Sequence, residues 1–147
     1  MKLQSNTKQR AFTLIEVVVS LMIVVLSMGG IVGMYVQAAV RTEYSAHMLA
    51  AQLMALGGLE QVRGAKFDPR GAPPVDELVA TNFPQRVDVL DIGYSTTVQT
   101  KATNTYTIST VSTNPIVKLV RVDCTWAFPG RTGVITNTLY TYRAPSQ

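Results

Sequence analysis

The sequence predicts an α+β protein in which a long N-terminal helix, partly membrane-spanning, packs on a C-terminal antiparallel β-sheet. Three observations support this fold class. Residues 17–40 carry no charged side chain and are mostly apolar. Residues 41–63 contain no proline and repeat apolar side chains at helical spacing. From residue 87 onward the apolar period changes to two, in segments rich in Thr, Val and Tyr, which is typical of strands.

The overall composition excludes several classes of protein. The chain has 147 residues, of which 47% are hydrophobic and 15% charged, with 13 Lys and Arg against 9 Asp and Glu. This balance argues against intrinsic disorder, and the length allows one domain of ordinary size. The single Cys excludes an internal disulfide and a Cys-rich zinc site. A Ser-His-Asp or Cys-His catalytic site would have to use His47, the only histidine.

The apolar run at residues 17–40 is expected to be a retained membrane span. Its 24 residues would form a helix of about 36 Å, enough for a hydrocarbon core of about 30 Å. Lys2, Lys8 and Arg10 precede it without any acidic residue, so this end is expected in the cytoplasm and the rest outside. A removable signal peptide is the alternative, but its apolar core is usually shorter. A buried core helix would need cover on every side.

Glu16 is the one charge near the start of this helix. Thr13 and Glu16 have the spacing of a capping box, in which both side chains bind early backbone N–H groups. This interpretation needs no partner. The alternative is that Glu16 pairs with a positive charge supplied within the membrane, where an unpaired carboxylate costs a few kcal/mol.

The sequence RAFTLIEV at residues 10–17 resembles the processing site of type IV pilins and pseudopilins. The resemblance implies that a prepilin peptidase removes the leader, residues 1–11, between Ala11 and Phe12 and that Phe12 is then N-methylated. The family almost always has Gly where this chain has Ala11. The resemblance also implies that Glu16 pairs with the N-terminal amine of a neighbouring subunit during assembly.

Three glycines interrupt the membrane part of the helix, namely Gly29, Gly30 and Gly33. They are interpreted either as sites of close helix packing or as a point where the helix can locally unwind during assembly. Many major pilins have a proline at the position matching Gly33.

The helix is expected to cover residues 12–63 and to become amphipathic over residues 41–63. Leu49, Leu53 and Leu56 lie at i, i+4 and i+7, and Leu59 with Val62 roughly continues this stripe. The stripe Leu49–Val62 is predicted to cover the sheet. The segment 64–86 holds four of the seven prolines and is predicted to be a surface connection. Its acidic residues do not have the spacing of a calcium loop, so no metal or other cofactor is expected.

The sheet domain is expected to occupy residues 87–147. The predicted strands are residues 87–91, 94–100, 105–111, 116–126 and 134–142. The turns between them are predicted at residues 92–93, 101–104, 112–115 and 129–133. The alternation at residues 120–126 places Cys124 on the core face, as a small buried hydrophobe.

The resemblance implies a pilin fold and a structural rather than enzymatic role. Within the family, residues 49–68 and 117–126 are most similar to minor subunits, the I-type minor pseudopilin of type II secretion and the V-type minor pilin. The expected partners are other pilin or pseudopilin subunits, the prepilin peptidase and the inner-membrane assembly platform. The expected location is the bacterial inner membrane, in a single pass, and a pilus or pseudopilus after assembly.

The same residues favour no other class of function. No phosphate loop, metal cluster or catalytic triad indicates an enzyme. The basic residues outside the leader are scattered, so nucleic-acid binding is not expected. The remaining alternative is a membrane-anchored or secreted periplasmic β-domain with a binding role.

Overall fold

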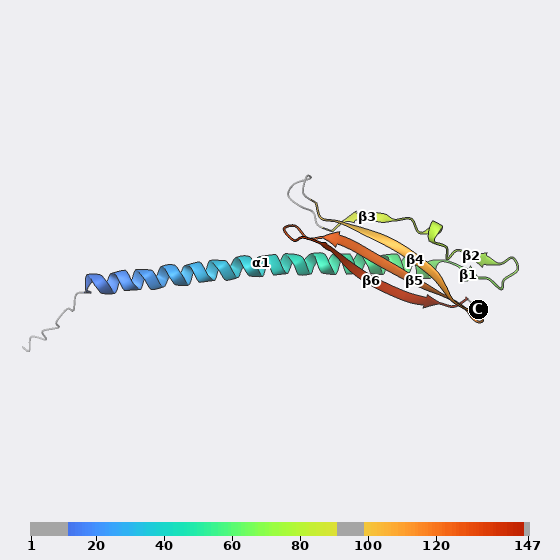
Figure 1. Ribbon diagram of the computed structural model, residues 1–147, viewed down its shortest axis with the longest axis horizontal. Coiled ribbons are helices and arrows are strands. Elements are labelled where there is room, and N and C mark those ends of the chain that lie inside the picture. The colour runs from blue at the N-terminus through green and yellow to red at the C-terminus, as the bar shows by residue number, and fades with distance from the viewer. Residues whose placement is uncertain (1–11, 91–98, 146–147) are drawn as a thin grey trace, which may run out of the picture. The chain divides into compact units, whose positions relative to one another are not determined.

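The computed structural model describes residues 12–90 and 99–145 of the chain. These residues form two compact units, which divide between Thr42 and Glu43. The helix α1, Leu14–Gly64, belongs to both units (Figure 1). It begins two residues later than predicted and ends one residue later.

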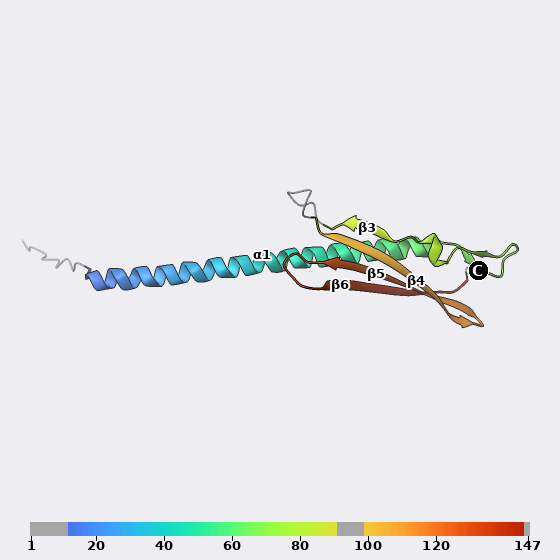
Figure 2. The ribbon, with the colours of Figure 1, turned by 45° about the horizontal axis from the view of Figure 1, so that its top comes forward.

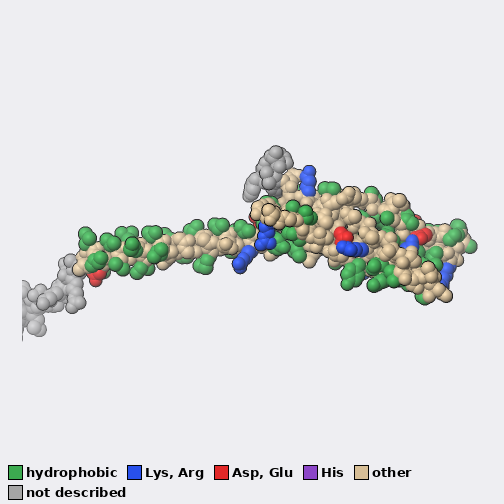
Figure 3. Space-filling model, in the orientation of Figure 1, with side chains coloured by type: hydrophobic (Ala, Val, Ile, Leu, Met, Phe, Trp, Pro, Cys, Tyr) green, Lys and Arg blue, Asp and Glu red, His purple; other side chains and the backbone are tan. Residues whose placement is uncertain are grey.

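The first unit consists of the helix up to Thr42. By length and composition this helix can cross a membrane, and none of the side chains in its most apolar window is buried. Hydrophobic side chains are visible all along this part (Figure 3). The expected long apolar helix is therefore present.

The second unit contains a four-stranded antiparallel sheet in the order β3-β4-β5-β6, which is a meander (Figure 2). The strands are β3 (Arg86–Val89), β4 (Lys101–Thr113), β5 (Ile116–Ala127) and β6 (Val134–Arg143). A two-stranded sheet of β1 (Phe67–Asp68) and β2 (Val75–Asp76), followed by the 3-10 helix η1 (Ala80–Asn82), precedes them. Residues 43–64 of α1 cover one face of the large sheet, so the predicted α+β pilin fold is confirmed (Figure 1).

The core lies between α1 and the inner face of the sheet. Strand β5 contributes Val120, Val122, Cys124 and Trp126, of which none is more than 2% exposed. The predicted alternation and the buried position of Cys124 are therefore confirmed.

The predicted stripe covers the sheet only at its C-terminal end. Leu59 and Val62 are buried in the core, as predicted, but Leu49, Leu53 and Leu56 remain 56%, 59% and 44% exposed. The buried face of α1 consists of His47, Ala51, Ala55, Gly58, Leu59 and Val62. The prediction was wrong for the first three leucines because small side chains bring the helix close to the sheet there, whereas a row of leucines would hold the two apart.

Two buried asparagines on the sheet form hydrogen bonds with the helix at this short separation. Asn104 Nδ2 on β4 donates to the carbonyl oxygen of Met54 at 2.9 Å. Asn137 Nδ2 on β6 donates to the carbonyl oxygen of Met48 at 3.2 Å. Both amides are almost fully buried, so these bonds replace contacts with water that the side chains lost on folding.

The segment 64–86 is not a simple surface connection. Its apolar residues Phe67, Leu78 and Phe83 are buried in the core. The prolines and glycines form the exposed turns between these three buried residues. The high proline and glycine content of the whole segment therefore did not indicate that it contributes to the core.

The strand prediction was accurate for β5 and β6 and wrong at the start of β4. Residues 101–104 were predicted to be a turn but form the beginning of β4, where Ala102 and Asn104 face the core. The predicted strand 94–100 lies mostly outside the described residues, and its last two residues are not strand. The turn between β5 and β6 uses Gly130 and Gly133, both with positive φ.

The close helix–sheet contact makes Gly58 a test of the packing. A Cβ at Gly58 would lie 2.8 Å from Tyr106 Oη and 3.2 Å from Asn104 Nδ2, whereas one at Gly57 would meet nothing within 4 Å. We expect Gly58→Ala to lower the free energy of unfolding by about 1–2 kcal/mol, because the crowding outweighs the gain in helix propensity. The measurement is guanidinium unfolding of the full chain in detergent, followed by the fluorescence of Trp126.

Gly57→Ala is the matched control. It should raise the free energy of unfolding by about 0.5–1 kcal/mol, since alanine favours a helix interior over glycine. Equal stabilisation by both substitutions would contradict the proposed close contact at Gly58.

Candidate functional site

The N-terminal turn of α1 holds the residues that the sequence singled out for processing and assembly. Phe12 is 81% exposed and lies just before the helix. Ala11 and the rest of residues 1–11 lie outside the described residues. The cleavage site is therefore described from its Phe12 side only.

Thr13 and Glu16 form the reciprocal hydrogen bonds of a capping box. Glu16 Oε2 accepts from the backbone N–H of Thr13 at 2.9 Å and from its hydroxyl at 3.0 Å. The Thr13 hydroxyl in turn accepts from the backbone N–H of Glu16 at 3.4 Å. These bonds satisfy backbone donors that the first helical turn leaves without a partner, and the helix dipole favours the carboxylate at this end.

Two serines within the apolar part of the helix are satisfied by the helix itself. The hydroxyls of Ser20 and Ser27 each donate to the carbonyl four residues earlier, at 2.7 Å. Thr42 does the same at 2.9 Å. Such internal bonds lower the cost of placing these residues in hydrocarbon, where water is absent.

Gly29, Gly30 and Gly33 lie within the regular helix. A Cβ at any of them would meet nothing within 4 Å in this chain. The chain itself therefore gives no packing reason for glycine at these positions. Close approach of another helix and local unwinding both remain as interpretations.

His47 and Cys124 both lie in the core. His47 is buried, with its ring centroid 5.9 Å from that of Trp126 and 5.8 Å from that of Phe128. Burial raises the pKa of the Cys124 thiol, which disfavours the reactive thiolate. Within residues 12–90 and 99–145, no group of three or more His, Cys, Asp or Glu could hold a metal ion.

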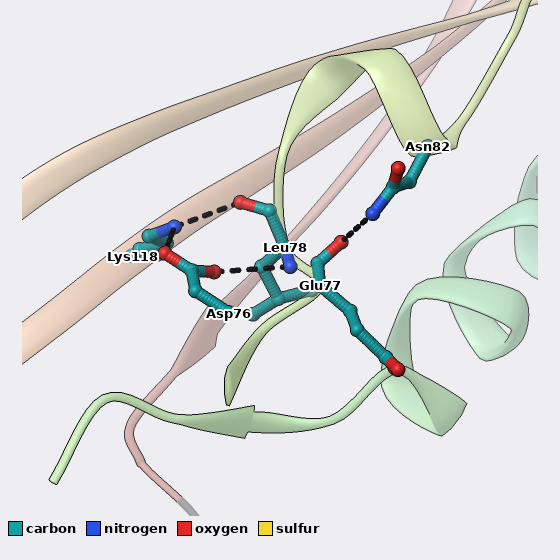
Figure 4. A network of polar contacts seen from close by, with 5 residues as sticks. All are labelled: Asp76, Glu77, Leu78, Asn82 and Lys118. Carbon is teal, nitrogen blue, oxygen red and sulfur yellow. Dashed lines mark hydrogen bonds and ion pairs between the residues drawn. The ribbon is translucent and has the colours of Figure 1, made fainter. Parts of the chain in front are cut away.

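Lys118, which no sequence motif singled out, contacts the acidic connecting segment 64–86 from the neighbouring strand β5 (Figure 4). Lys118 Nζ on β5 binds the Asp76 carboxylate and donates to the Leu78 carbonyl oxygen at 2.8 Å. The ammonium also lies 5.0 Å from the centroid of the Phe67 ring, and the Lys118 side chain is only 11% exposed. It thus supplies the positive charge to the carboxylate and ties the connection to the sheet.

This ion pair provides a second test. We expect Lys118→Met to lower the free energy of unfolding by about 1–3 kcal/mol, because Asp76 and the Leu78 carbonyl lose their partner. The same unfolding assay measures the change. In the control, Arg63→Met breaks an ion pair with Glu60 whose side chains are 50% and 54% exposed, and it should cost at most about 1 kcal/mol. An equally small effect of both substitutions would contradict the role of Lys118.

A groove of about 450 Å³ lies between α1 and β3. No local sequence pattern indicates it, because its walls come from two separate segments, residues 50–61 and residues 86–90. Asn104 also lines it, and among the described residues its buried Oδ1 has no hydrogen-bond partner.

The comparisons with known proteins point to the N-terminal segment. Residues 6–32 match the family model of the prokaryotic N-terminal methylation motif. This range includes Ala11, Phe12 and Glu16. The comparisons with curated proteins and with solved structures gave no significant match.

Proposed function

We propose that this chain, which has the prepilin-type motif and long apolar helix of a type IV pilin-like protein, is a minor pilin or minor pseudopilin. A prepilin peptidase removes residues 1–11, and the new N-terminus at Phe12 is methylated. The helix holds the subunit in the inner membrane with the sheet domain outside the cytoplasm. The subunit then joins a filament with other pilin-like subunits at the assembly platform.

The motif match at the start of an uncovered apolar helix carries this proposal. Leu26 and Tyr35 are 77% and 76% exposed, and nothing in the described part of the chain shields them. Lipid covers such side chains before assembly, and helices of neighbouring subunits replace it afterwards. The exposed Leu49, Leu53 and Leu56 are a further apolar surface that the subunit leaves uncovered.

The charge distribution supports an insertion role for the leader. The full chain has a formal net charge of +4. Lys2, Lys8 and Arg10 all lie in the leader, so its removal leaves a nearly neutral product. The excess of basic residues thus favours a cytoplasmic position for the N-terminal end of the helix and does not form a binding surface on the sheet domain.

The geometry at Glu16 is compatible with a partner from another subunit. Among the described residues, the hydrogen bonds to this carboxylate reach Oε2 only. Oε1 can therefore accept a bond from the Phe12 amine of a neighbour while the cap persists. In a medium of low dielectric, pairing removes the large cost of two isolated charges and favours one axial register.

Substitution of Glu16 separates capping from charge pairing. We expect Glu16→Val to insert into the membrane and to be processed, but to enter filaments at least about tenfold less, because its neighbour's amine stays unpaired. Immunoblots of sheared filament and membrane fractions measure incorporation.

Glu16→Gln is the matched control, because glutamine preserves a capping box but carries no charge. It should assemble as poorly as Glu16→Val. Normal assembly of the glutamine variant would assign Glu16 to capping alone, and normal assembly of the valine variant would remove it from assembly.

The N-terminal sequence of the mature protein tests the proposal as a whole. A start at Phe12 is the expected result. A start at Ala39, directly after the small-residue sequence Val36-Gln37-Ala38, would indicate a cleaved signal peptide and a secreted domain. A start at Met1 would indicate an unprocessed anchor.

A further inference from the structure

The turn between β5 and β6, residues 128–133, is held against α1 by an aromatic contact (Figures 1 and 2). Phe128 is 6% exposed, and its ring centroid lies 5.4 Å from that of Tyr44 on the helix, edge to face. The backbone N–H of Arg131 donates to the carbonyl oxygen of Phe128 at 3.1 Å and closes the turn. The turn therefore has a defined position beside Tyr44.

The Arg131 side chain folds back onto the same part of the helix. Its Cζ lies 5.1 Å from the centroid of the Tyr44 ring, which is a cation–π contact. None of the ion pairs in the described part of the chain includes this guanidinium, although Glu43 precedes Tyr44 in the helix. The residue is exposed, and the ring contact leaves the N–H groups of the planar guanidinium able to donate to an anion.

The sequence around Arg131 favours an anionic ligand at a boundary between water and an apolar phase. Arg131 is the only charged residue between Asp123 and Arg143, so the turn offers a cation without an acidic side chain next to it in the chain. Val134 directly follows the turn and is 69% exposed. An arginine beside an exposed apolar side chain is suited to a membrane surface, where a charged head and an apolar group meet different surroundings.

The position of Tyr44 in the chain brings this cation near the expected membrane surface. Tyr44 follows Val40, the last residue of the uncharged apolar run, by four residues. Within α1 this separation is about 6 Å along the helix axis, and four residues cannot span more than about 14 Å in any conformation. The polar headgroups extend about 5–7 Å beyond each side of the hydrocarbon core. When residues 17–40 span the bilayer, Tyr44 therefore lies in or next to the headgroup layer.

We propose that Arg131 binds the phosphate groups of phospholipids on the membrane face where the sheet domain lies. The guanidinium donates to two phosphate oxygens, as its planar fork allows, while the Tyr44 ring limits its movement. The contact holds the β5–β6 turn at the membrane surface before assembly. The inference rests on the proposed function for the membrane span and for the position of the sheet domain outside the cytoplasm.

Fluorescence quenching of the full chain in lipid nanodiscs tests the contact. Each nanodisc holds one copy, so no neighbouring subunit can supply an anion. A fluorophore is attached to Thr132→Cys in the turn, or to Thr113→Cys at the opposite end of β5. Both threonines are exposed, whereas the native Cys124 is buried and does not take the label. The lipids are phosphatidylcholine and phosphatidylglycerol with a nitroxide on the headgroup. We expect strong quenching at position 132 and much weaker quenching at position 113.

Removal of the charge should release the turn from the membrane surface. We expect Arg131→Gln to lower the ratio of docked to undocked label about fivefold, which is the contribution of one arginine near an anionic lipid surface. Fluorescence lifetimes of the label give the two populations. Arg121→Gln is the matched control, because it removes an equal charge from the ion pair with Asp123, outside the turn, and it should leave the ratio unchanged. Trp126 fluorescence verifies that both variants fold.

Several results would overturn the lipid contact. They are an unchanged ratio in Arg131→Gln, an equal fall in Arg121→Gln, and equal quenching at positions 132 and 113. Absence of quenching at position 132 would also overturn it and would favour an acidic group of a neighbouring subunit as the partner of Arg131. These outcomes are separate from those for the proposed function. A mature N-terminus at Phe12 without docking in nanodiscs would reject the Arg131 contact alone, whereas a different N-terminus would reject the filament subunit.

Discussion

The structure depends on one constraint, which is that α1 must satisfy its own polar groups in two different surroundings. An α-helix pairs its backbone internally, so it can pass through hydrocarbon where other open structures cannot. Near its start and in the apolar part, polar side chains bind within the helix: Thr13 binds Glu16, and Ser20 and Ser27 bind backbone carbonyls. Over residues 43–64 the helix pairs its backbone N–H groups internally, so the sheet can reach its backbone only through side chains that donate to helix carbonyls, as Asn104 and Asn137 do.

The sheet meets the helix through small residues and amides, and this choice determines what stays exposed. Ala51, Ala55 and Gly58 allow a short separation, at which Asn104 and Asn137 reach carbonyl oxygens of the helix. Hydrogen bonds from these asparagine side chains fix the register of the helix against the sheet more specifically than leucine contacts would. Leu49, Leu53 and Leu56 are then exposed on the side of α1 that faces away from the sheet. An apolar face that the chain does not use internally is available to other subunits.

The sequence predicted the features that depend on local spacing. The apolar run, the capping box and the alternation of β5 each lie within one continuous segment, and the structure contains all three. The stripe Leu49–Val62 was right at Leu59 and Val62 and wrong at its first three leucines, because hydrophobicity ranks leucine above alanine and does not encode how closely two elements approach. Asn104 was assigned to a turn because asparagine favours turns, but it is buried to bind Met54. The groove and the Lys118 ion pair join distant segments, and a single sequence carries no signal for such contacts.

The edge strand β3 is short and carries charged side chains. Arg86 Nε lies 2.7 Å from Asp88 Oδ2 on this strand. Charged side chains on a short edge strand resist indiscriminate pairing with other chains, because an added strand would have to bury or displace them. The same choice that leaves β3 polar therefore protects the edge of the sheet from aggregation, while the apolar side chains of the sheet are concentrated on β5 under the helix.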